Sequence, residues 1–307
     1  MSSNHFDALR KPDWLKIDFS SEGSFTETSN AIKEGALHTI CASGKCPNRS
    51  TCWNSGTATF MIGGNVCTRA CRFCATESAQ NPPALDPLEP LHVAESIKKM
   101  GLKYAVLTSV DRDDLEDGGA SHWRSAVLET RRLSPGVTIE VLIPDFNGRE
   151  RDIDTVLSSA PDVVGHNLET VRRLTPSVRH RATYDRSLSV LKHISESGFI
   201  TKTGIMVGLG ETEDEVIDTM KDCLSAGVST LTIGQYLRPT KRHIPVSEYV
   251  HPDTFARYKE IGEKLGLSHV ESGPLVRSSF RAGRQFASAQ EKHRVNLREI
   301  LSHKSAE

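Results

Sequence analysis

Short apolar runs alternate with amphipathic stretches through the middle of the chain. The apolar runs are rich in β-branched residues, as buried parallel strands are, and the stretches between them space their apolar residues as helices do. These patterns predict strands at 58–64, 103–110, 137–143, 161–167, 199–210 and 229–237, and helices at 92–101, 120–133, 152–160, 184–198 and 212–227. Repeated strand–helix units predict a parallel sheet with helices on its outer face.

The predicted sheet is too short to close into a full barrel. Its six strands use far less chain than the ~250 residues that an eight-stranded barrel takes. We therefore expect an α/β fold with a partial (βα)6 TIM-like barrel over residues 58–265. The flanks, 1–57 and 266–307, lack the strand–helix pattern, and we expect them to form irregular N-terminal and C-terminal extensions that cover the open parts of the barrel.

Charge and cysteine usage narrow the class of protein. The 38 basic and 39 acidic residues nearly balance, so no overall field draws the protein to nucleic acid or to an anionic membrane. No apolar run approaches the ~20 residues of a membrane helix, and the N-terminus lacks a signal-peptide core, so we expect a cytoplasmic protein. Six of the seven cysteines lie between positions 41 and 74, which in a reducing compartment favours metal over disulfides. The seventh, Cys223, follows a capping box of Thr212 and Glu215 on an amphipathic helix and is expected to be buried filler.

The stretch CTRACRFC follows the first predicted strand and spaces Cys67, Cys71 and Cys74 as C-x3-C-x2-C. Active sites of such barrels lie at the carboxyl ends of the strands, so this position suits a site. Zinc sites and most iron–sulfur clusters take four protein ligands. Three thiolates suit a 4Fe–4S cluster that is held by three irons, with the fourth iron open to a small molecule.

With Phe73 before its last cysteine, this motif resembles that of the radical S-adenosylmethionine superfamily. The resemblance implies that the open iron is chelated by the amino and carboxylate groups of S-adenosylmethionine. It also implies that an electron from the cluster cleaves this cofactor, and that the resulting 5'-deoxyadenosyl radical removes a hydrogen atom from the substrate.

A second cysteine triplet lies in the N-terminal extension. CASGKCPNRSTC spaces Cys41, Cys46 and Cys52 as C-x4-C-x5-C, which predicts a second cluster. The spacing alone is equally compatible with an electron-relay or a structural cluster.

Nearly the whole chain resembles the lipoyl synthase family. The matching segments are KPDWLK, CPNRSTCW, CTRACRFC, TSVDRDDLEDGGA, EVLIPDF, HNLETV, TKTGIMVGLGET, LTIGQYLRPTKRHIPV and GPLVRSSF. The resemblance implies insertion of two sulfur atoms, at C6 and C8 of an octanoyl chain that is amide-linked to a lysine of a lipoyl carrier protein. It implies two 4Fe–4S clusters and S-adenosylmethionine as cofactors, with the second cluster as the sulfur donor. The implied partners are an octanoylated carrier domain or protein, an electron donor such as ferredoxin or flavodoxin, and an iron–sulfur cluster carrier.

In that family the second cluster takes three cysteines and one serine of a C-terminal Arg-Ser-Ser-Tyr motif. Carried onto this chain, the serine is Ser278 or Ser279, and we favour Ser279. An alkoxide is a harder ligand than a thiolate and is more easily protonated away, which suits a cluster that gives up sulfide. The chain departs from the family at Phe280, where Tyr is usual, and at Gly165, where Asn is usual.

Two other functions are considered. Another radical sulfur-insertion or methylthiolation enzyme would share CTRACRFC but not the paired N-terminal cysteines with a terminal serine pair. A non-catalytic two-cluster electron carrier would be reduced without consuming S-adenosylmethionine.

Further cofactor contacts are expected at the later strand ends. Gly204 and Gly208 of GIMVGLGE are candidates for backbone approach to adenine, and glycine there also suits a turn. Asn167 and Glu169 are candidates for hydrogen bonds to the ribose or the methionyl amino group, and equally suit a helix cap and a first-turn acid.

Two charged loops have open interpretations. The acidic stretch TSVDRDDLEDGGA is either a solvated loop or a segment that closes the site against water. The basic residues Arg238, Lys241, Arg242 and His243 form either a solvated face or a rim that docks an acidic carrier.

Overall fold

An eight-stranded sheet forms the scaffold of the protein. The computed structural model describes residues 10–16, 25–35, 37–54 and 58–287. The sheet has the order β1-β2-β5-β6-β7-β8-β9-β10, in which β1 runs antiparallel to β2 and every other pair is parallel. Its strands are β1 (His38–Thr39), β2 (Thr59–Ile62), β5 (Tyr104–Ser109), β6 (Thr138–Leu142), β7 (Val163–Gly165), β8 (Ile200–Val207), β9 (Thr230–Gln235) and β10 (His269–Gly273).

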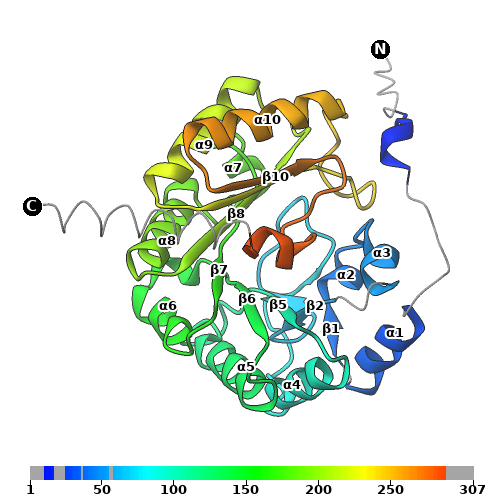
Figure 1. Cartoon of the computed structure of the whole chain (residues 1–307), viewed down its shortest axis with the longest axis vertical. Coiled ribbons are helices and arrows are strands. Elements are labelled where there is room, and N and C mark those ends of the chain that lie inside the picture. The colour runs from blue at the N-terminus through cyan, green and yellow to red at the C-terminus, as the bar shows by residue number, and fades with distance from the viewer. Residues whose placement is uncertain (1–9, 17–24, 36, 55–57, 288–307) are drawn as a thin grey trace, which may run out of the picture.

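Helices cover the outer face of this sheet, which curves into an open arc (Figure 1). The outer helices are α4 (Glu89–Lys99), α5 (Ala120–Leu133), α6 (Glu150–Leu157), α8 (Tyr184–Glu196), α9 (Glu213–Ser225) and α10 (Pro252–Leu265). The short elements are η1 (Asp13–Leu15), η2 (Phe146–Gly148), α7 (Thr175–Val178) and the parallel pair β3 (Val66–Cys67) and β4 (Glu77–Ser78). Among the residues described, no helix has both the length and the apolar character to cross a membrane.

The predicted α/β partial barrel is confirmed, and the structure adds to it. Each of the six predicted strands contains an observed parallel strand, and the sheet does not close between β1 and β10 in the described part of the chain. The capping box of Thr212 and Glu215 is present, and Cys223 is fully buried. A seventh parallel strand, β10, pairs with β9 beyond the predicted barrel. Its sequence HVESG has no apolar run, because only Val270 is fully buried there, so the pattern of hydrophobic positions missed it.

The N-terminal extension is more regular than expected. It forms α1 (Phe25–Glu34), α2 (Ile40–Ser43) and α3 (Arg49–Asn54) beside the open edge at β1 (Figure 1). The Phe25 and Trp53 rings pack 5.1 Å apart, and the Thr28 hydroxyl donates to the Trp53 carbonyl at 3.0 Å. Ile32, Cys41 and Trp53 of these helices join the hydrophobic core of the barrel. The helices were missed because they do not belong to repeated strand–helix units.

The C-terminal segment turns from β10 into the interior of the arc (Figure 1). It passes so close to β9 that a Cβ atom at Gly234 would overlap the carbonyl oxygen of Val276. The Asn48 side chain donates to the Leu275 carbonyl at 2.6 Å, which joins this segment to the N-terminal extension. Described parts of both extensions therefore help to close the barrel interior.

Because the two segments pass so close, a single methyl group added at Gly234 is expected to destabilise the fold. Gly234→Ala is expected to lower the free energy of unfolding by about 1–3 kcal/mol, because β9 and the Val276 backbone must separate. Gly136→Ala is the matched control, since a Cβ there meets nothing within 4 Å, and it should change stability by less than about 1 kcal/mol. Urea unfolding measures the stability of both variants. Equal stability of the two would contradict the close approach of the Val276 backbone to β9.

Candidate active site

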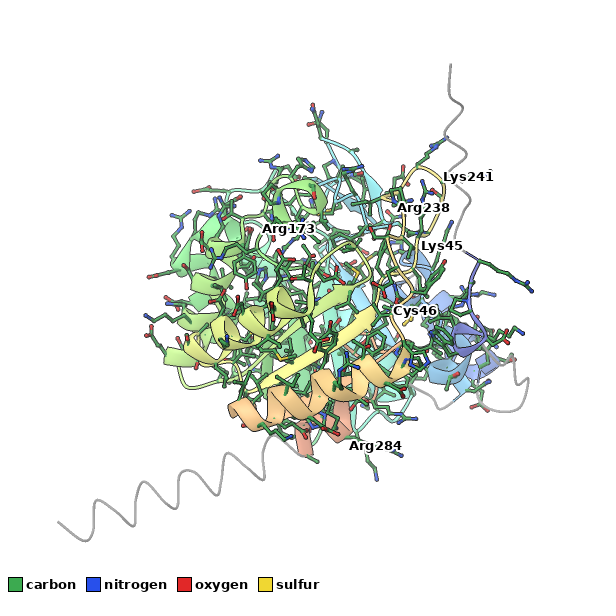
Figure 2. All side chains as sticks on the ribbon, turned by 90° about the horizontal axis from the view of Figure 1, so that it is seen from above. Lys45, Cys46, Arg173, Arg238, Lys241 and Arg284 are labelled. Atoms are coloured by element: carbon green, nitrogen blue, oxygen red, sulfur yellow. The ribbon has the colours of Figure 1, made fainter. Side chains whose placement is uncertain are left out.

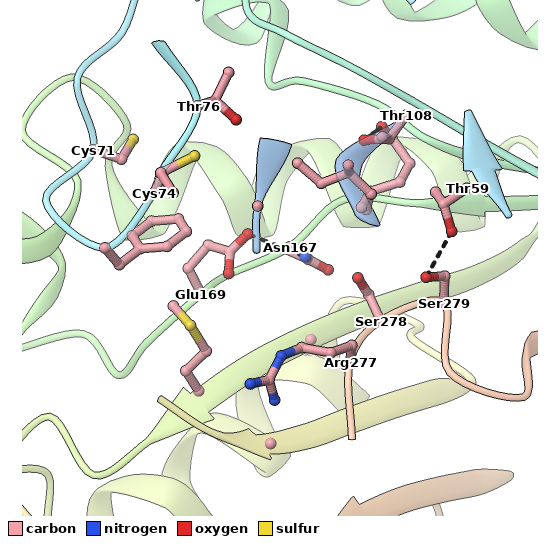
Figure 3. A pocket seen from close by; sticks show the side chains of 18 of the residues that line it. Thr59, Cys71, Cys74, Thr76, Thr108, Asn167, Glu169, Arg277, Ser278 and Ser279 are labelled. Carbon is pink, nitrogen blue, oxygen red and sulfur yellow. Dashed lines mark hydrogen bonds between the residues drawn. The ribbon is translucent and has the colours of Figure 1, made fainter. Parts of the chain in front are cut away.

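A cavity of about 450 Å³ occupies the interior of the arc. Its walls come from the inward-facing residues of β2, β5, β6, β8 and β9, from the loops at the carboxyl ends of the strands, and from both extensions. Figure 3 shows Cys71 and Cys74 of the CTRACRFC segment on one side of this cavity and the serine pair, Ser278 and Ser279, on another. The lining residues with candidate chemistry are Cys67, Cys71, Phe73, Cys74, Asn167, Glu169, Gly204, Arg277, Ser278 and Ser279.

The three cysteines of CTRACRFC all line this cavity. Cys74 interacts electrostatically with both Cys67 and Cys71, so the three thiols form one group. Burial raises the pKa of Cys67 and of Cys71 to about 12, and it also raises the pKa of Cys74. In the metal-free chain these groups are therefore neutral thiols, which a bound metal would deprotonate.

The buried guanidinium of Arg69 holds this cysteine loop against the barrel. Its side chain is 2% exposed and binds Asp113 twice, at 2.8 Å each, and Asp145 at 2.7 Å. It also lies 3.3 Å from a carboxylate oxygen of Asp111. The carboxylates follow β5 and β6, so the loop is fixed to two neighbouring strand ends.

The pKa values of these carboxyl groups follow from burial and, among the nearby charges, above all from that of Arg69. Although burial alone favours the neutral acids, hydrogen bonds and charge from Arg69 hold the pKa of Asp145 and of Asp113 below the usual range. At Asp111 the effect of burial exceeds that of the Arg69 charge, so the pKa of this carboxyl is raised. This carboxylate lies 3.7 Å from the Cys67 sulfur.

The acidic loop is thus part of the site rather than a solvated segment. Besides the two carboxylates that bind Arg69, Arg112 pairs with Asp114 and donates to the Gly63 carbonyl at 3.2 Å. Asp117 accepts from the backbone at the start of α5. The sequence alone did not predict these pairings, but an arginine inside the cysteine motif and an acid-rich loop after the next strand were the available signal.

The N-terminal cysteines lie behind one wall of the cavity. Cys41 lies on α2 and is buried, Cys46 follows in the loop, and Cys52 lies on α3. Cys46 interacts electrostatically with Cys41 and with Arg277 of the C-terminal segment. The three cysteines do not themselves line the cavity, whereas their neighbours Ile40, Gly44, Lys45 and Pro47 do.

The serine pair reaches the same cavity from the C-terminal segment (Figure 3). Ser279 accepts a hydrogen bond of 2.9 Å from the Thr59 hydroxyl on β2. Arg277 also lines the cavity, and in the described residues it forms no salt bridge to an acid. Because Arg277 is a cation near Cys46 and the serine pair, it would stabilise anionic ligand groups such as thiolates.

The cysteine groups differ in how they suit the clusters that the motifs imply. Within the described residues, no three His, Cys, Asp or Glu side chains converge as the ligands of one metal ion do. A 4Fe–4S cluster has a different requirement, because each protein ligand binds a different iron and the ligands surround the whole cluster. Three thiols around one cavity fit that requirement at CTRACRFC. For the N-terminal triplet the observed links are those of Cys46 to Cys41 and to Arg277.

Asn167 and Glu169 face the cavity from the loop after β7, and their interpretation as a helix cap and a first-turn acid is wrong. No helix begins there, since α7 starts only at Thr175. Instead Glu169 has φ +67° and bridges to Ile205 of β8, and its carboxylate accepts from Asn167 at 3.0 Å. Burial raises the pKa of Glu169. The buried Oδ1 atom of Asn167 has no hydrogen-bond partner in the described structure, so the loop offers an unused acceptor to a ligand.

The two glycines of the fifth predicted strand differ in position. Gly204 lines the cavity, where a Cβ atom would crowd Asn167 and Thr232. Gly208 does not line it but turns the chain after β8 with φ +93°, and a Cβ there would overlap Gln235 and the Glu248 carbonyl. Phe73 lines the cavity and packs against the cluster of Val178, Leu209 and Tyr236.

A buried ion pair at the barrel interior was not predicted. Lys202 of β8 and Glu140 of β6 lie 2.7 Å apart, each side chain 4% exposed, and the Tyr104 hydroxyl donates to the same carboxylate at 2.6 Å. A charged residue in the middle of each of two otherwise apolar strands was the signal. Because Glu140 lines the cavity, the pair adds a polar group to its wall.

Gly165 and Phe280, the two departures from the family pattern, have well-defined neighbours in the structure. Gly165 lies at the end of β7, where a Cβ atom would meet Leu142 and the Lys202 carbonyl at 3.4 Å. The Phe280 ring packs under the guanidinium of Arg281 at 4.9 Å, so ring packing is retained without the tyrosine hydroxyl.

Comparison with known proteins identifies the class. The family model of the radical SAM superfamily matches residues 61–223. Methylornithine synthase superposes with a TM-score of 0.52 at 12% identity, covering 79% of this chain and 75% of that one. Streptococcus suis SuiB bound to a precursor peptide gives a TM-score of 0.54 at 11% identity, covering 81% of this chain, which spans about half of SuiB. The open arc and the cysteine loop at the end of its first parallel strand are those of a radical SAM enzyme.

Closer relatives define the family within that class. The chain is 58% identical to lipoyl synthase of Parabacteroides distasonis over 89% of this chain and 97% of that protein. It is 57% identical to that of Porphyromonas gingivalis, over 90% and 98%, and 54% identical to that of Treponema denticola, over 91% and 96%. The chain belongs to the lipoyl synthase family, and its resemblance to that family is confirmed along most of its length.

The Arg69 cluster leads to a stability prediction. Arg69→Met is expected to lower the free energy of unfolding by about 3–5 kcal/mol, because Asp113 and the buried Asp145 lose the buried cation that binds them both, and Asp145 is left with the more exposed Arg186 at 3.3 Å. The loss should be full at neutral pH and shrink below about pH 4, since acids with lowered pKa stabilise the fold above their unfolded pKa and lose that contribution as pH falls.

Arg181→Met is the matched control. Arg181 lies 3.8 Å from the same Asp113, but its side chain is 51% exposed, so its loss should cost less than about 1 kcal/mol. Urea unfolding from pH 3 to pH 7 compares the two variants. Similar losses for both would contradict a special role for the buried arginine.

Proposed function

We propose that this enzyme inserts two sulfur atoms, at C6 and C8 of an octanoyl group that is amide-linked to a lysine of a lipoyl carrier protein. The observation that carries the proposal is the convergence of two distant segments on one cavity. CTRACRFC after β2 and the serine pair of the C-terminal segment both line it, in a member of the lipoyl synthase family. This convergence supports radical chemistry and sulfur donation at the same substrate space.

We assign Cys67, Cys71 and Cys74 as ligands of the cluster that binds S-adenosylmethionine. When bound, the two 4Fe–4S clusters and S-adenosylmethionine supply the radical that removes hydrogen and the sulfide that replaces it. The sequence motif and the shared cavity position of the three thiols support the first assignment.

We assign Cys41, Cys46, Cys52 and Ser279 as ligands of the auxiliary cluster. The Asn48–Leu275 hydrogen bond and the interaction of Cys46 with Arg277 tie the triplet to the serine segment. The Thr59 hydroxyl would go on donating to Ser279 as an alkoxide, which supports the choice of Ser279 over Ser278.

The remaining lining suits an acyl chain and a cofactor. Met61, Val106, Leu142, Ile205 and Val276 give apolar walls for eight carbons, and an acyl chain packed against them would displace water from this part of the cavity. We propose that Phe73, Asn167, Glu169 and Gly204 contact S-adenosylmethionine, supported by the unused acceptor on Asn167. Gly208 is proposed to contribute by turning β8 toward that ligand.

The required partners follow from the chemistry. We propose an octanoylated carrier domain or protein, an electron donor such as ferredoxin or flavodoxin, and a carrier that delivers iron–sulfur clusters. We also propose a cytoplasmic location, because thiols that serve as cluster ligands require a reducing compartment.

Anaerobic reconstitution tests the reaction. The protein loaded with about eight irons per chain is mixed with reductant, S-adenosylmethionine and a short octanoyl-lysine peptide, and masses are measured. Formation of 5'-deoxyadenosine with a dithiolated peptide is expected. Deoxyadenosine without added sulfur would refute the proposed reaction, and reduction without loss of S-adenosylmethionine would indicate an electron carrier.

Variants of the serine pair test the ligand assignment. Ser279→Ala is expected to abolish sulfur insertion while 5'-deoxyadenosine still forms, because the radical-generating site is intact. Ser278→Ala, which changes the neighbouring hydroxyl in the same cavity, should retain insertion. Iron content and the spectrum of the auxiliary cluster provide a second measurement. Insertion retained by both variants would rule out a serine ligand.

A further inference from the structure

The mouth of the cavity carries a group of exposed cations. Lys45 and Arg238 line the cavity and are exposed, and Lys241 and Arg242 follow on the exposed loop after β9. We call these four residues the basic rim. Within the described residues none of the four forms a salt bridge. Figure 2 shows Lys45, Arg238 and Lys241 near one another on one side of the molecule.

The loop that carries three of these cations is fixed to the site. The Nε2 atom of His243 lies 2.9 Å from the Cys74 carbonyl, and the Ile244 N–H donates to the Arg72 carbonyl at 3.1 Å. The Arg238 guanidinium donates to the His243 carbonyl at 2.9 Å and to the Lys241 carbonyl at 2.5 Å. The rim therefore keeps a defined position next to the cysteine loop.

The backbone also fixes the fourth cation. Lys45 has φ +49°, a left-handed conformation that is unfavourable for a residue with a side chain. Two backbone hydrogen bonds in this turn, Lys45 to Ala42 and Cys46 to Cys41, hold it between two of the N-terminal cysteines. Strain of this kind persists where the surrounding structure requires it, often at functional sites.

We propose that the basic rim docks an acidic surface that surrounds the acylated lysine of the carrier protein. This inference rests on the proposed function, because an octanoyl-lysine arm fits a 450 Å³ cavity whereas the folded domain that bears it does not. The surface of that domain must stop at the mouth, against these cations. Since the chain is nearly neutral overall, the attraction is local to the rim.

A comparison of two substrates tests the docking surface. The double variant Lys241→Glu with Arg242→Glu is assayed with the octanoylated carrier protein and with a short uncharged octanoyl-lysine peptide. With the carrier, KM should rise about tenfold and its dependence on salt should weaken, while kcat stays unchanged, because rim charges act on encounter. With the peptide, both constants should match the wild type. Lys45→Glu should act in the same direction, with iron content measured to show that the adjacent cluster is retained.

Arg284→Glu is the matched control, since this exposed arginine lies apart from the rim (Figure 2). It should leave KM for the carrier unchanged. An unchanged KM in the double variant, or an equal rise in the Arg284 variant, would overturn the docking proposal. Absence of sulfur insertion into the peptide by the wild-type enzyme would instead refute the proposed function, so the two failures are distinguishable.

Discussion

The position of the cysteine loop depends on one buried cation. Arg69 lies inside the loop, nearly without solvent contact, and meets carboxylates that follow two different strands. A buried guanidinium is stable only when its charge and its donors are matched, so the loop has one favourable position on the barrel. The geometry of CTRACRFC is therefore set by β5 and β6, although its cysteines come directly after β2. The acidic loop that supplies two of the carboxylates is a structural part of the site.

The barrel orients the loops of the site, whereas the two extensions close its cavity. The parallel strands direct the cysteine loop, Asn167 and Glu169 toward one cavity, as strand ends do in α/β barrels generally. An open arc leaves part of that cavity without a wall. The N-terminal helices and the segment around Val276 supply the missing wall, and they meet through Asn48 and Leu275. The same segments carry the residues that we propose as auxiliary cluster ligands.

Much of the fold and part of the site could be predicted from sequence. Strands such as KYAVLTSV are apolar on both faces because helices and cavity cover them, which gives a strong local signal. The strand HVESG gives none, because it lies at an edge and buries one residue fully. The cysteines were identifiable from spacing, whereas the contact of Thr59 with Ser279 spans 220 residues and has no local pattern. Asn167 suited a helix cap in sequence, but the chain there forms a bridge to β8 instead.

The meeting of the chain ends also affects how the protein is made. The hydrogen bonds of Asn48 to Leu275 and of Thr59 to Ser279 join positions 227 and 220 residues apart. During synthesis the N-terminal side of these contacts is made first and must wait until residues 275–279 have followed. The loop of Cys67, Cys71 and Cys74 needs only the neighbouring strands, whose carboxylates bind Arg69. The parts of the wall that the two extensions share are therefore brought together later in synthesis than the cysteine loop and its strands.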